Sequence, residues 1–566
     1  MTPNETPSKP FNEKGYVETV DFETSTDEPQ LTGFAKWKDS FRRQPSGRTI
    51  GEQLQKGISK RHLILMALVT GIGTGLFVGA GSALSNAGPL FLIIAYIVIG
   101  SMIYPTLQSA GEMAVNYSEL SGGYNNYPRK FVDPAVAFAT SWNYFIQWIS
   151  IISLELVVAA MTIQYWSTSI NPDVWVAVVY IVINFINYQG AKGYGEAEFI
   201  IGSIKITMIV GFIIMALVIN LGGGPEGIYI GGKFWHDPGF HTNFKGLVSV
   251  FITASFSYSM SELVALSAAE QKNPRKSIPL SCKLMAWRII LFFLGSLTMV
   301  GLLVPYNSPR LLGSGSGDTS ASPFVLAAEL HGVKVVPHII NAVICLSVTS
   351  VGSSALYSAS RTLQSLADQG FAPDWFNYID KAGRPLRSLL TCSALGLFAF
   401  IAAYEKQDLV FQWLLAISGL SQLFTWFGIC LSHIRFRRAL AYNNISLNSL
   451  GYISSTGIWG SYYAMTWHVL IIVSQFYIAL FPVGGAAPTA ENFFKNFLGA
   501  IFFLALYFGY KIYYKDWQLY IRTKDIDINA DRTIFDEEVL NLERQEEADR
   551  YKALSLPMKV IHILFF

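Results

Sequence analysis

Residues 62–86 read HLILMALVTGIGTGLFVGAGSALSN, and this stretch decides the fold class. It contains no Asp, Glu, Lys or Arg, and it exceeds the roughly 20 apolar residues that a helix needs to cross a bilayer core. Three glycines fall within it at alternate positions, Gly71, Gly73 and Gly75. Because each glycine costs a helix interior roughly 1 kcal/mol relative to alanine, the stretch predicts a membrane-spanning helix that breaks near its middle.

The same apolar length recurs along the chain and predicts twelve membrane-spanning segments. They lie at 62–86, 89–115, 135–166, 174–190, 196–220, 247–269, 284–305, 335–367, 388–403, 409–433, 460–481 and 493–514. Composition agrees, because only 14% of the 566 residues are charged, where a soluble protein carries about 25%. We therefore expect an all-α membrane protein with a twelve-helix domain at 61–514. A disordered cytosolic N-terminal tail (1–60) and a cytosolic C-terminal tail (515–566) would flank it.

Basic residues gather in alternate loops between these segments. They are Arg129, Lys130, Lys192, Lys272, Arg275, Lys276, Lys381, Arg384, Arg387, Arg435, Arg437 and Arg438. Loops rich in Lys and Arg stay on the cytosolic side of a membrane. The pattern therefore predicts that both termini are cytosolic.

Several classes of function are disfavoured by what the chain lacks. A net charge of +2 without a basic groove gives no footprint for nucleic acid. The four cysteines and eight histidines show no metal-like spacing, so we expect no metal and no cofactor. No phosphate-binding loop or nucleophile and base set is evident. We expect neither an enzyme nor an ATP-driven pump.

The glycine-rich break in the first segment has two interpretations. A break within a membrane is tolerated where the freed backbone groups face protein, water or a ligand. The second half-helix would then aim its N–H groups, over Gly71, Ile72, Gly73, Thr74 and Gly75, at an anion such as a substrate carboxylate. Alternatively, Gly71, Gly75 and Gly79, spaced by four, form a small-residue packing face. The residues alone leave both open.

The sixth segment carries hydroxyl side chains at every second position, followed by an acid. These are Thr253, Ser255, Ser257, Ser259, Ser261 and then Glu262. A period of two suits no helix face, so the pattern predicts unwound backbone whose carbonyls hold an ammonium group. The alternative is a regular helix whose hydroxyls bond back to their own carbonyls.

Three ionisable residues fall inside predicted membrane segments. They are Glu155, Lys205 and Glu262. A charge at the bilayer centre costs about 2.5–3.5 kcal/mol even on lenient scales, and such residues usually serve transport. We interpret them as carriers of protons or as contacts to substrate. The alternative is a buried Glu and Lys pair that only holds helices together.

A series of motifs in order resembles the yeast amino acid permeases of the amino acid/polyamine/organocation superfamily, most closely the fungal general amino acid permeases. The motifs are Arg61-His62 leading into Ile72-Gly73-Thr74-Gly75-Leu76-Phe77-Val78-Gly79, Ser85-Asn86-Ala87-Gly88-Pro89, Gly193-Tyr194-Gly195-Glu196-Ala197-Glu198-Phe199, Tyr229-Ile230-Gly231-Gly232-Lys233, Glu262-Leu263-Val264, Asn273-Pro274-Arg275-Lys276 and Gly301-Leu302-Leu303-Val304-Pro305-Tyr306-Asn307. The likeness runs from about Lys60 to Asp531.

The resemblance implies a LeuT-like fold of two inverted five-helix repeats plus two C-terminal helices, in the plasma membrane. It also implies that backbone around Gly73, Thr74 and Gly75 takes the substrate carboxylate. It further implies that carbonyls near Ser255, Phe256 and Ser259 take the ammonium, with the Phe256 ring as a gate over the side chain.

The same resemblance implies that Lys205 occupies the place that sodium fills in sodium-driven relatives, so that protons drive transport. It also likens Lys9 and Lys14 to tail lysines that carry ubiquitin, which would make ubiquitin ligase machinery a partner. Two features depart from the family pattern: Val69-Thr70 replaces consecutive glycines, and the chain ends Ile563-Leu564-Phe565-Phe566 without a cysteine for lipidation.

We expect a proton-coupled amino acid symporter of broad specificity that imports amino acids across the fungal plasma membrane. Broad specificity is expected because the third, eighth and tenth segments show no excess of anions that would select basic substrates. Two alternatives are an amino acid receptor that signals without net transport and a permease for polyamines or S-adenosylmethionine.

Overall fold

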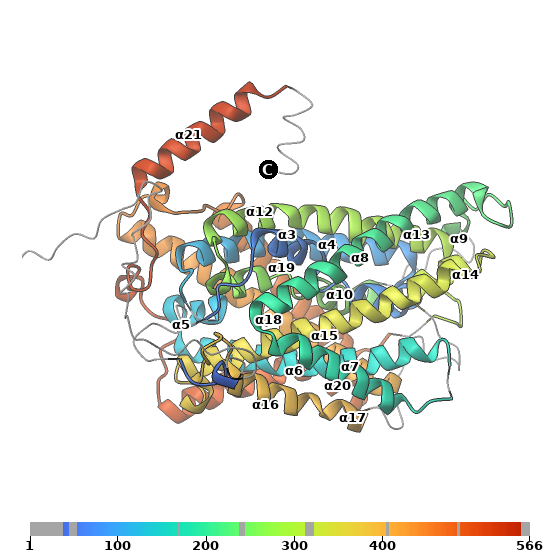
Figure 1. The fold of residues 1–566 in the computed structure, drawn as a ribbon, viewed down its shortest axis with the longest axis horizontal. Helices are drawn as coiled ribbons and strands as arrows, with labels where there is room; N and C mark the ends of the chain where they lie inside the picture. The colour runs from blue at the N-terminus through green and yellow to red at the C-terminus, as the bar shows by residue number, and fades with distance from the viewer. Residues whose placement is uncertain are drawn as a thin grey trace, which may run out of the picture.

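The computed structural model describes residues 35, 38–44, 54–120, 122–167, 169–236, 244–311, 322–402, 407–483 and 487–555 (Figure 1). Within these ranges the regular structure is helical, and extended pairing is limited to two isolated bridges. Lys9, Lys14 and the last residues of the chain lie outside the described part.

The first predicted span is built from three pieces. Helix α3 (Lys60–Val69) is followed by a break, then by the π-helical turn η1 (Gly75–Gly79) and the start of α4 (Ala80–Asn116). Gly88 within α4 has φ 71° and ψ 173°, and Pro89 follows it, so the chain turns there. Because only glycine adopts such a φ readily, this residue separates the first span from the second.

The remaining spans follow in the predicted order. They are α6 (Pro134–Gln164), α7 (Pro172–Tyr188), α8 (Gly190–Val218), α10 (Phe244–Tyr258) with α11 (Leu263–Leu266), α12 (Pro274–Trp287) continued by η5 (Arg288–Gly295) and α13 (Ser296–Leu303), α15 (Val336–Asp368), α16 (Leu386–Gly396) with α17 (Phe398–Ala402), α18 (Gln407–Tyr442), α19 (Gly457–Leu480) and α20 (Ala490–Tyr514). Shorter elements are η2 (Gly123–Asn125), α5 (Tyr127–Phe131), η3 (Ile219–Gly223), α9 (Lys233–His236), η4 (Ala268–Glu270), α14 (Pro323–Glu329), η6 (Asp374–Asn377), η7 (Leu447–Ser449), η8 (Thr523–Asp525) and α21 (Glu537–Ala553).

Twelve spans are present in the described part of the chain. Nine helical stretches are long and apolar enough to cross a membrane, α7 and the helix at Leu386–Phe400 are shorter and apolar, and Gly88 divides one of the nine. The seventh span begins at Pro274, ten residues before its predicted start at 284. Its first turns carry Arg275, Lys276 and Lys283, so hydropathy does not reveal them as part of the helix.

The spans pack in the order expected of an inverted-repeat transporter. The third and eighth spans, α6 and α15, hold equivalent positions in the two repeats and pack against each other. Helix α3 packs on α8 and α12, while α10 packs along α4. The last two spans, α19 and α20, lie outside this core, since most of their apolar surface is not covered by protein.

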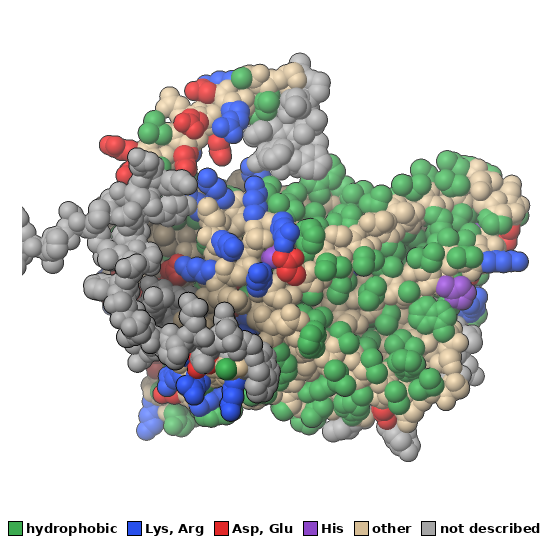
Figure 2. All heavy atoms as spheres, viewed as in Figure 1, with side chains coloured by type: hydrophobic (Ala, Val, Ile, Leu, Met, Phe, Trp, Pro, Cys, Tyr) green, Lys and Arg blue, Asp and Glu red, His purple; other side chains and the backbone are tan. Residues whose placement is uncertain are grey.

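The surface has an apolar belt and a cationic end. In Figure 2, hydrophobic side chains cover most of the visible face, whereas Lys and Arg side chains gather at one end. The loops that carry them contact one another: Arg129 donates to the carbonyl of Gln369, and Arg435 Nε to that of Phe131 at 3.1 Å. The alternate basic loops therefore share one side of the membrane.

Parts of both tails pack at the same cationic end. Asp39 pairs with Lys381 at 2.7 Å, and Tyr378 donates to the carbonyl of Phe41. After α20 the chain returns, and the Thr533 N–H donates to the carbonyl of Asn116 at 2.8 Å. Helix α21 then projects away from the bundle (Figure 1).

Candidate functional site

The first span breaks between Val69 and Thr74. Thr70 leaves the helix with ψ 130°, and Gly71 has φ 83°, in the left-handed region. A Cβ added to Gly71 would lie 2.4 Å from the carbonyl oxygen of Ser259. Only glycine fits, because both the backbone angle and the close approach exclude a side chain.

The glycines of the first span also form a packing face against the sixth. A Cβ on Gly75 would lie 2.6 Å from Ser257 Cα, and one on Gly79 would lie 2.9 Å from Thr253 Cγ2. Gly73 points elsewhere, since its Cβ would meet Val351 of α15 at 2.6 Å. The two interpretations of this stretch are therefore compatible: the helix breaks, and its small residues bring the two broken spans together.

The sixth span breaks over Ser259–Glu262, between α10 and α11. Met260 has φ 67°, which L side chains rarely adopt. The break is shorter than the serine pattern predicted, because Thr253 to Tyr258 remain helical. The Ser257 hydroxyl donates back to the carbonyl of Thr253 at 2.7 Å, so the alternative of a hydroxyl-rich helix describes that part.

Polar groups without partners lie at the first break and on helix α10, which precedes the second break. The N–H groups of Gly73, Thr74 and Gly75 donate to no backbone carbonyl of the described chain, as expected for the first residues of a helix. The buried Ser255 hydroxyl also has no hydrogen-bond partner among the described residues. Phe256, beside it, is buried.

Glu155 of α6 contacts the first break directly. The Thr74 hydroxyl donates to Glu155 Oε2 at 2.7 Å. The other carboxylate oxygen, Oε1, is buried and has no partner in the described chain. One oxygen of this acid is therefore free to hold a proton or to accept from a cation.

Lys205 of α8 lies in a buried polar cluster beside the same break. Its ammonium donates to Ser350 Oγ at 3.0 Å and lies 3.9 Å from Glu198 Oε1. Glu198 also accepts from the hydroxyls of Ser350 and Thr70, the latter at 3.0 Å. The cluster thus joins α8 and α15 to the end of α3, and Lys205 interacts electrostatically with Glu155 across it.

Sequence reasoning named Glu198 only as part of a motif and gave it no role. It precedes Lys205 by seven residues, which is about two helical turns, so the two side chains share a face of α8. That spacing is the signal that could have identified the pair.

Glu262 sits at the second break and is fully satisfied by neighbouring spans. Its Oε1 accepts from Tyr144 OH at 3.1 Å and from Gln422 Nε2 at 3.0 Å, and its Oε2 accepts from Trp426 Nε1 at 3.1 Å. These donors come from α6 and α18. The carboxylate therefore ties the break of the sixth span to its surroundings.

A buried ion pair joins the chain after the sixth span to the eighth span. Glu270 Oε1 lies 2.9 Å from Arg361 Nη2, and Tyr357 donates to the same carboxylate. The Arg361 guanidinium lies 3.7 Å from the centre of the Tyr357 ring, which stacks on Tyr194. Burial raises the pKa of Glu270, and the Arg361 charge opposes that shift.

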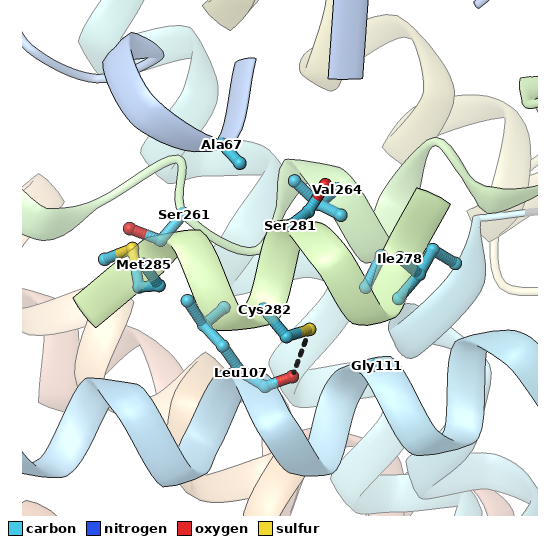
Figure 3. A pocket seen from close by; sticks show the side chains of 10 residues that line it. Ala67, Leu107, Gly111, Ser261, Val264, Ile278, Ser281, Cys282 and Met285 are labelled. Carbon is cyan, nitrogen blue, oxygen red and sulfur yellow. Dashed lines mark hydrogen bonds between the residues drawn. The ribbon is translucent and has the colours of Figure 1, made fainter. Parts of the chain in front are cut away.

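A small cavity lies among the helices beside the second break. Figure 3 shows the cavity between α3, α4, α11 and α12, lined by Ala67, Leu107, Ser261, Val264 and Met285 among others. Its volume of about 10 Å³ is at the lower limit for one water molecule. This cavity is therefore too small to hold an amino acid.

The comparisons with known proteins agree with this arrangement. The family model described as amino acid permease matches residues 62–522. This chain belongs to the amino acid permease family. Members of this family are transporters and not enzymes. Among the described residues of this permease, no group of three His, Cys, Asp or Glu side chains could hold a metal ion.

Three relatives from Saccharomyces cerevisiae illustrate the range of the family. The chain is 51% identical to a high-affinity glutamine permease, over 88% of this chain and 77% of that protein. It is 50% identical to the general amino acid permease AGP1, over 88% and 80%. It is 44% identical to a valine amino-acid permease, over 93% and 90%.

Proposed function

We propose that this permease is a symporter that imports a broad range of amino acids together with protons across the fungal plasma membrane, with both termini in the cytosol. The observation that carries the proposal is the pair of facing helix breaks with a buried set of ionisable groups around them. Breadth is supported by the relatives, which are named for glutamine, for valine and for amino acids in general.

Recognition of the substrate backbone follows from the groups at the two breaks. The N–H groups of Gly73, Thr74 and Gly75 take the carboxylate, with Gly71 and Ile72 shaping the approach, because a helix N-terminus favours an anion. Carbonyls near Ser255, Phe256 and Ser259 take the ammonium, and the Phe256 ring covers the side chain. A carboxylate site favours amino acids over polyamines, which have no carboxylate.

Glu262 contributes to the same site by holding the second break in place. Both oxygens of its carboxylate already accept hydrogen bonds from protein side chains, so its role is to position the carbonyls rather than to contact the ammonium.

Proton coupling is supported by the charges around the breaks. The buried set contains three acids, Glu155, Glu198 and Glu262, and two bases, Lys205 and Arg288. With every group ionised the set carries one negative charge, so one added proton makes it neutral. Neutrality matters at this depth, since a net charge in a low dielectric is costly. We assign proton carriage to Lys205 and Glu155, which share the cluster next to the first break.

Regulation through the tails is a further part of the proposal. Lys9 and Lys14 would accept ubiquitin from ligase machinery in the cytosol, as the resemblance implies.

Uptake by wild-type protein and by a Lys205→Gln variant tests the proposal. The protein is expressed in yeast that lacks its own amino acid permeases, and a panel of labelled amino acids is supplied with and without a protonophore. We expect wild-type cells to concentrate several amino acids and to lose accumulation with the protonophore. We expect Lys205→Gln to bind substrate but neither to concentrate it nor to respond to external pH.

Two controls separate the parts of this proposal. Both proteins are quantified at the cell surface, because a misfolded variant would also lose uptake. If accumulation by Lys205→Gln remains sensitive to the protonophore, proton carriage is assigned to Glu155 instead. A Glu155→Gln variant is tested in parallel. Absence of saturable uptake by the wild type would refute transport itself.

A further inference from the structure

The buried side chain of Arg288 is unexplained by the contacts of the described chain. It lies in η5 of the seventh span with no exposed surface. All three of its guanidinium nitrogens, Nε, Nη1 and Nη2, lack a hydrogen-bond partner among the described residues. Its ring contact, to Phe293 at 5.6 Å, comes from its own helix.

An arginine cannot escape this position by losing its proton. Guanidinium groups stay charged in proteins and present five N–H donors. Buried charges are almost always paired and hydrogen-bonded, because an unpaired one loses its hydration without compensation. A buried guanidinium without a hydrogen-bond partner among the described residues therefore points to an anionic ligand that accepts from it.

The position of Arg288 places that anion at the helix breaks. A Cβ on Gly71 would lie 3.0 Å from Arg288 Nη2 and 3.1 Å from Met260 Cβ. The guanidinium thus lies beside Gly71 of the first break, and Met260 of the second break also lies beside Gly71. Glu198, Glu262 and Tyr258 interact with it electrostatically, yet none is hydrogen-bonded to it.

The guanidinium is also close to the N–H groups of the first break. Gly71 and Gly73 are two residues apart, so their Cα atoms are separated by at most about 7.6 Å. A carboxylate offers two oxygens and about four acceptor positions. One oxygen can accept from the N–H groups of Gly73 to Gly75 while the other faces Arg288.

We propose that Arg288 binds the α-carboxylate of the transported amino acid, as a second donor beside the backbone of the first break. The inference rests on the proposed function, because it takes the substrate to be an amino acid. It adds a charged residue from the seventh span to a site otherwise made from the first and sixth. In the ligand-free protein the guanidinium has no hydrogen-bond partner among the described residues, and the substrate carboxylate supplies acceptors for it.

This role predicts an unusual combination of effects for Arg288→Met. The substitution removes an unpaired buried charge, so the ligand-free protein should melt at a higher temperature than wild type. Binding of a labelled amino acid should weaken at least tenfold, since charge-assisted hydrogen bonds are the strong ones. A fixed concentration of amino acid should therefore raise the melting temperature of Arg288→Met less than that of wild type.

Arg288→Lys and Lys283→Met serve as matched variants. Arg288→Lys keeps the positive charge but loses the planar guanidinium, so this variant should bind the amino acid with intermediate affinity. Lys283 is an exposed cation of the same span, and its Met variant should bind like wild type. Purified proteins in detergent are compared by equilibrium binding and by thermal melts with and without ligand.

Competition by a carboxamide gives the decisive readout. An amino acid amide has the same side chain and ammonium but a neutral carboxamide. We expect wild type to prefer the acid strongly and Arg288→Met to lose at least tenfold of that preference. An unchanged ratio of acid to amide affinity, or a ligand-free variant that melts below wild type, would overturn the proposal. Wild-type protein that binds no amino acid would instead refute the proposed function.

Discussion

At the scale of single residues, two positions of left-handed backbone define the site. Gly71 in the first break and Met260 in the second both have positive φ. Gly71 could be identified from the sequence, because three glycines at alternate positions predict a weak point in the helix. Met260 could not, since nothing in a methionine side chain favours that conformation.

Gly71→Ala should abolish uptake. A left-handed alanine costs roughly 1–2 kcal/mol, and its Cβ would lie 2.4 Å from the Ser259 carbonyl oxygen, so the two breaks must move apart. We expect at least a tenfold loss of amino acid uptake per molecule at the cell surface.

Gly211→Ala is the matched control for that variant. Gly211 lies in α8, and a Cβ there would meet nothing within 4 Å. Its uptake should equal that of wild type. Normal transport by Gly71→Ala would show that the contact between the breaks is not needed.

At the scale of helices, the second break is held by donors from two other spans. Glu262 accepts from Tyr144 of α6 and from Gln422 and Trp426 of α18. The sequence showed that an acid follows the serine pattern and suggested a contact with substrate. The helix packing shows that its oxygens are already occupied by protein donors.

Glu262→Gln should destabilise the protein more than Trp426→Phe. Glu262→Gln replaces a carboxylate, which only accepts, by an amide whose NH₂ group would face one of the neighbouring donors. Trp426→Phe removes one of the three hydrogen bonds to the carboxylate, and such a bond to a charged group is worth about 1.5–3 kcal/mol. Thermal melts of the purified variants measure the order. Equal melting temperatures for Glu262→Gln and wild type would mean that this carboxylate does not anchor the break.

At the scale of the whole molecule, a buried ion pair joins the chain after the sixth span to the eighth span. Glu270 follows the sixth span and Arg361 lies in the eighth, and the pair sits beside the stacked rings of Tyr194 and Tyr357. The pair therefore links the end of the broken sixth span to the long helix α15.

A double-mutant cycle measures how strongly Glu270 and Arg361 are coupled. Arg361→Met alone leaves the buried Glu270 carboxylate without its cation, and Glu270→Gln alone leaves the buried Arg361 guanidinium without its anion. Each single substitution should lower the free energy of unfolding by about 3–5 kcal/mol. The double variant removes both charges and should melt above the Arg361→Met protein. Melting temperatures that fall additively would show that the two residues act independently.

The sequence by itself determined the number and order of the spans, the place of the first break and the three ionisable residues within the membrane. These features are local: apolar length, glycine content and a charge inside an apolar run can each be read within one segment. The start of the seventh span was missed for the same reason, because its first turns are polar.

Only the tertiary structure decided which buried groups meet. Lys205 reaches Ser350, 145 residues away, and Glu262 reaches Tyr144 and Gln422, 118 and 160 residues away. Such pairs depend on how each helix is rotated about its axis and on which neighbours it packs against, and no single segment records either. The position of Arg288 follows from the same packing, which brings its guanidinium beside Gly71 without a hydrogen-bond acceptor among the described residues.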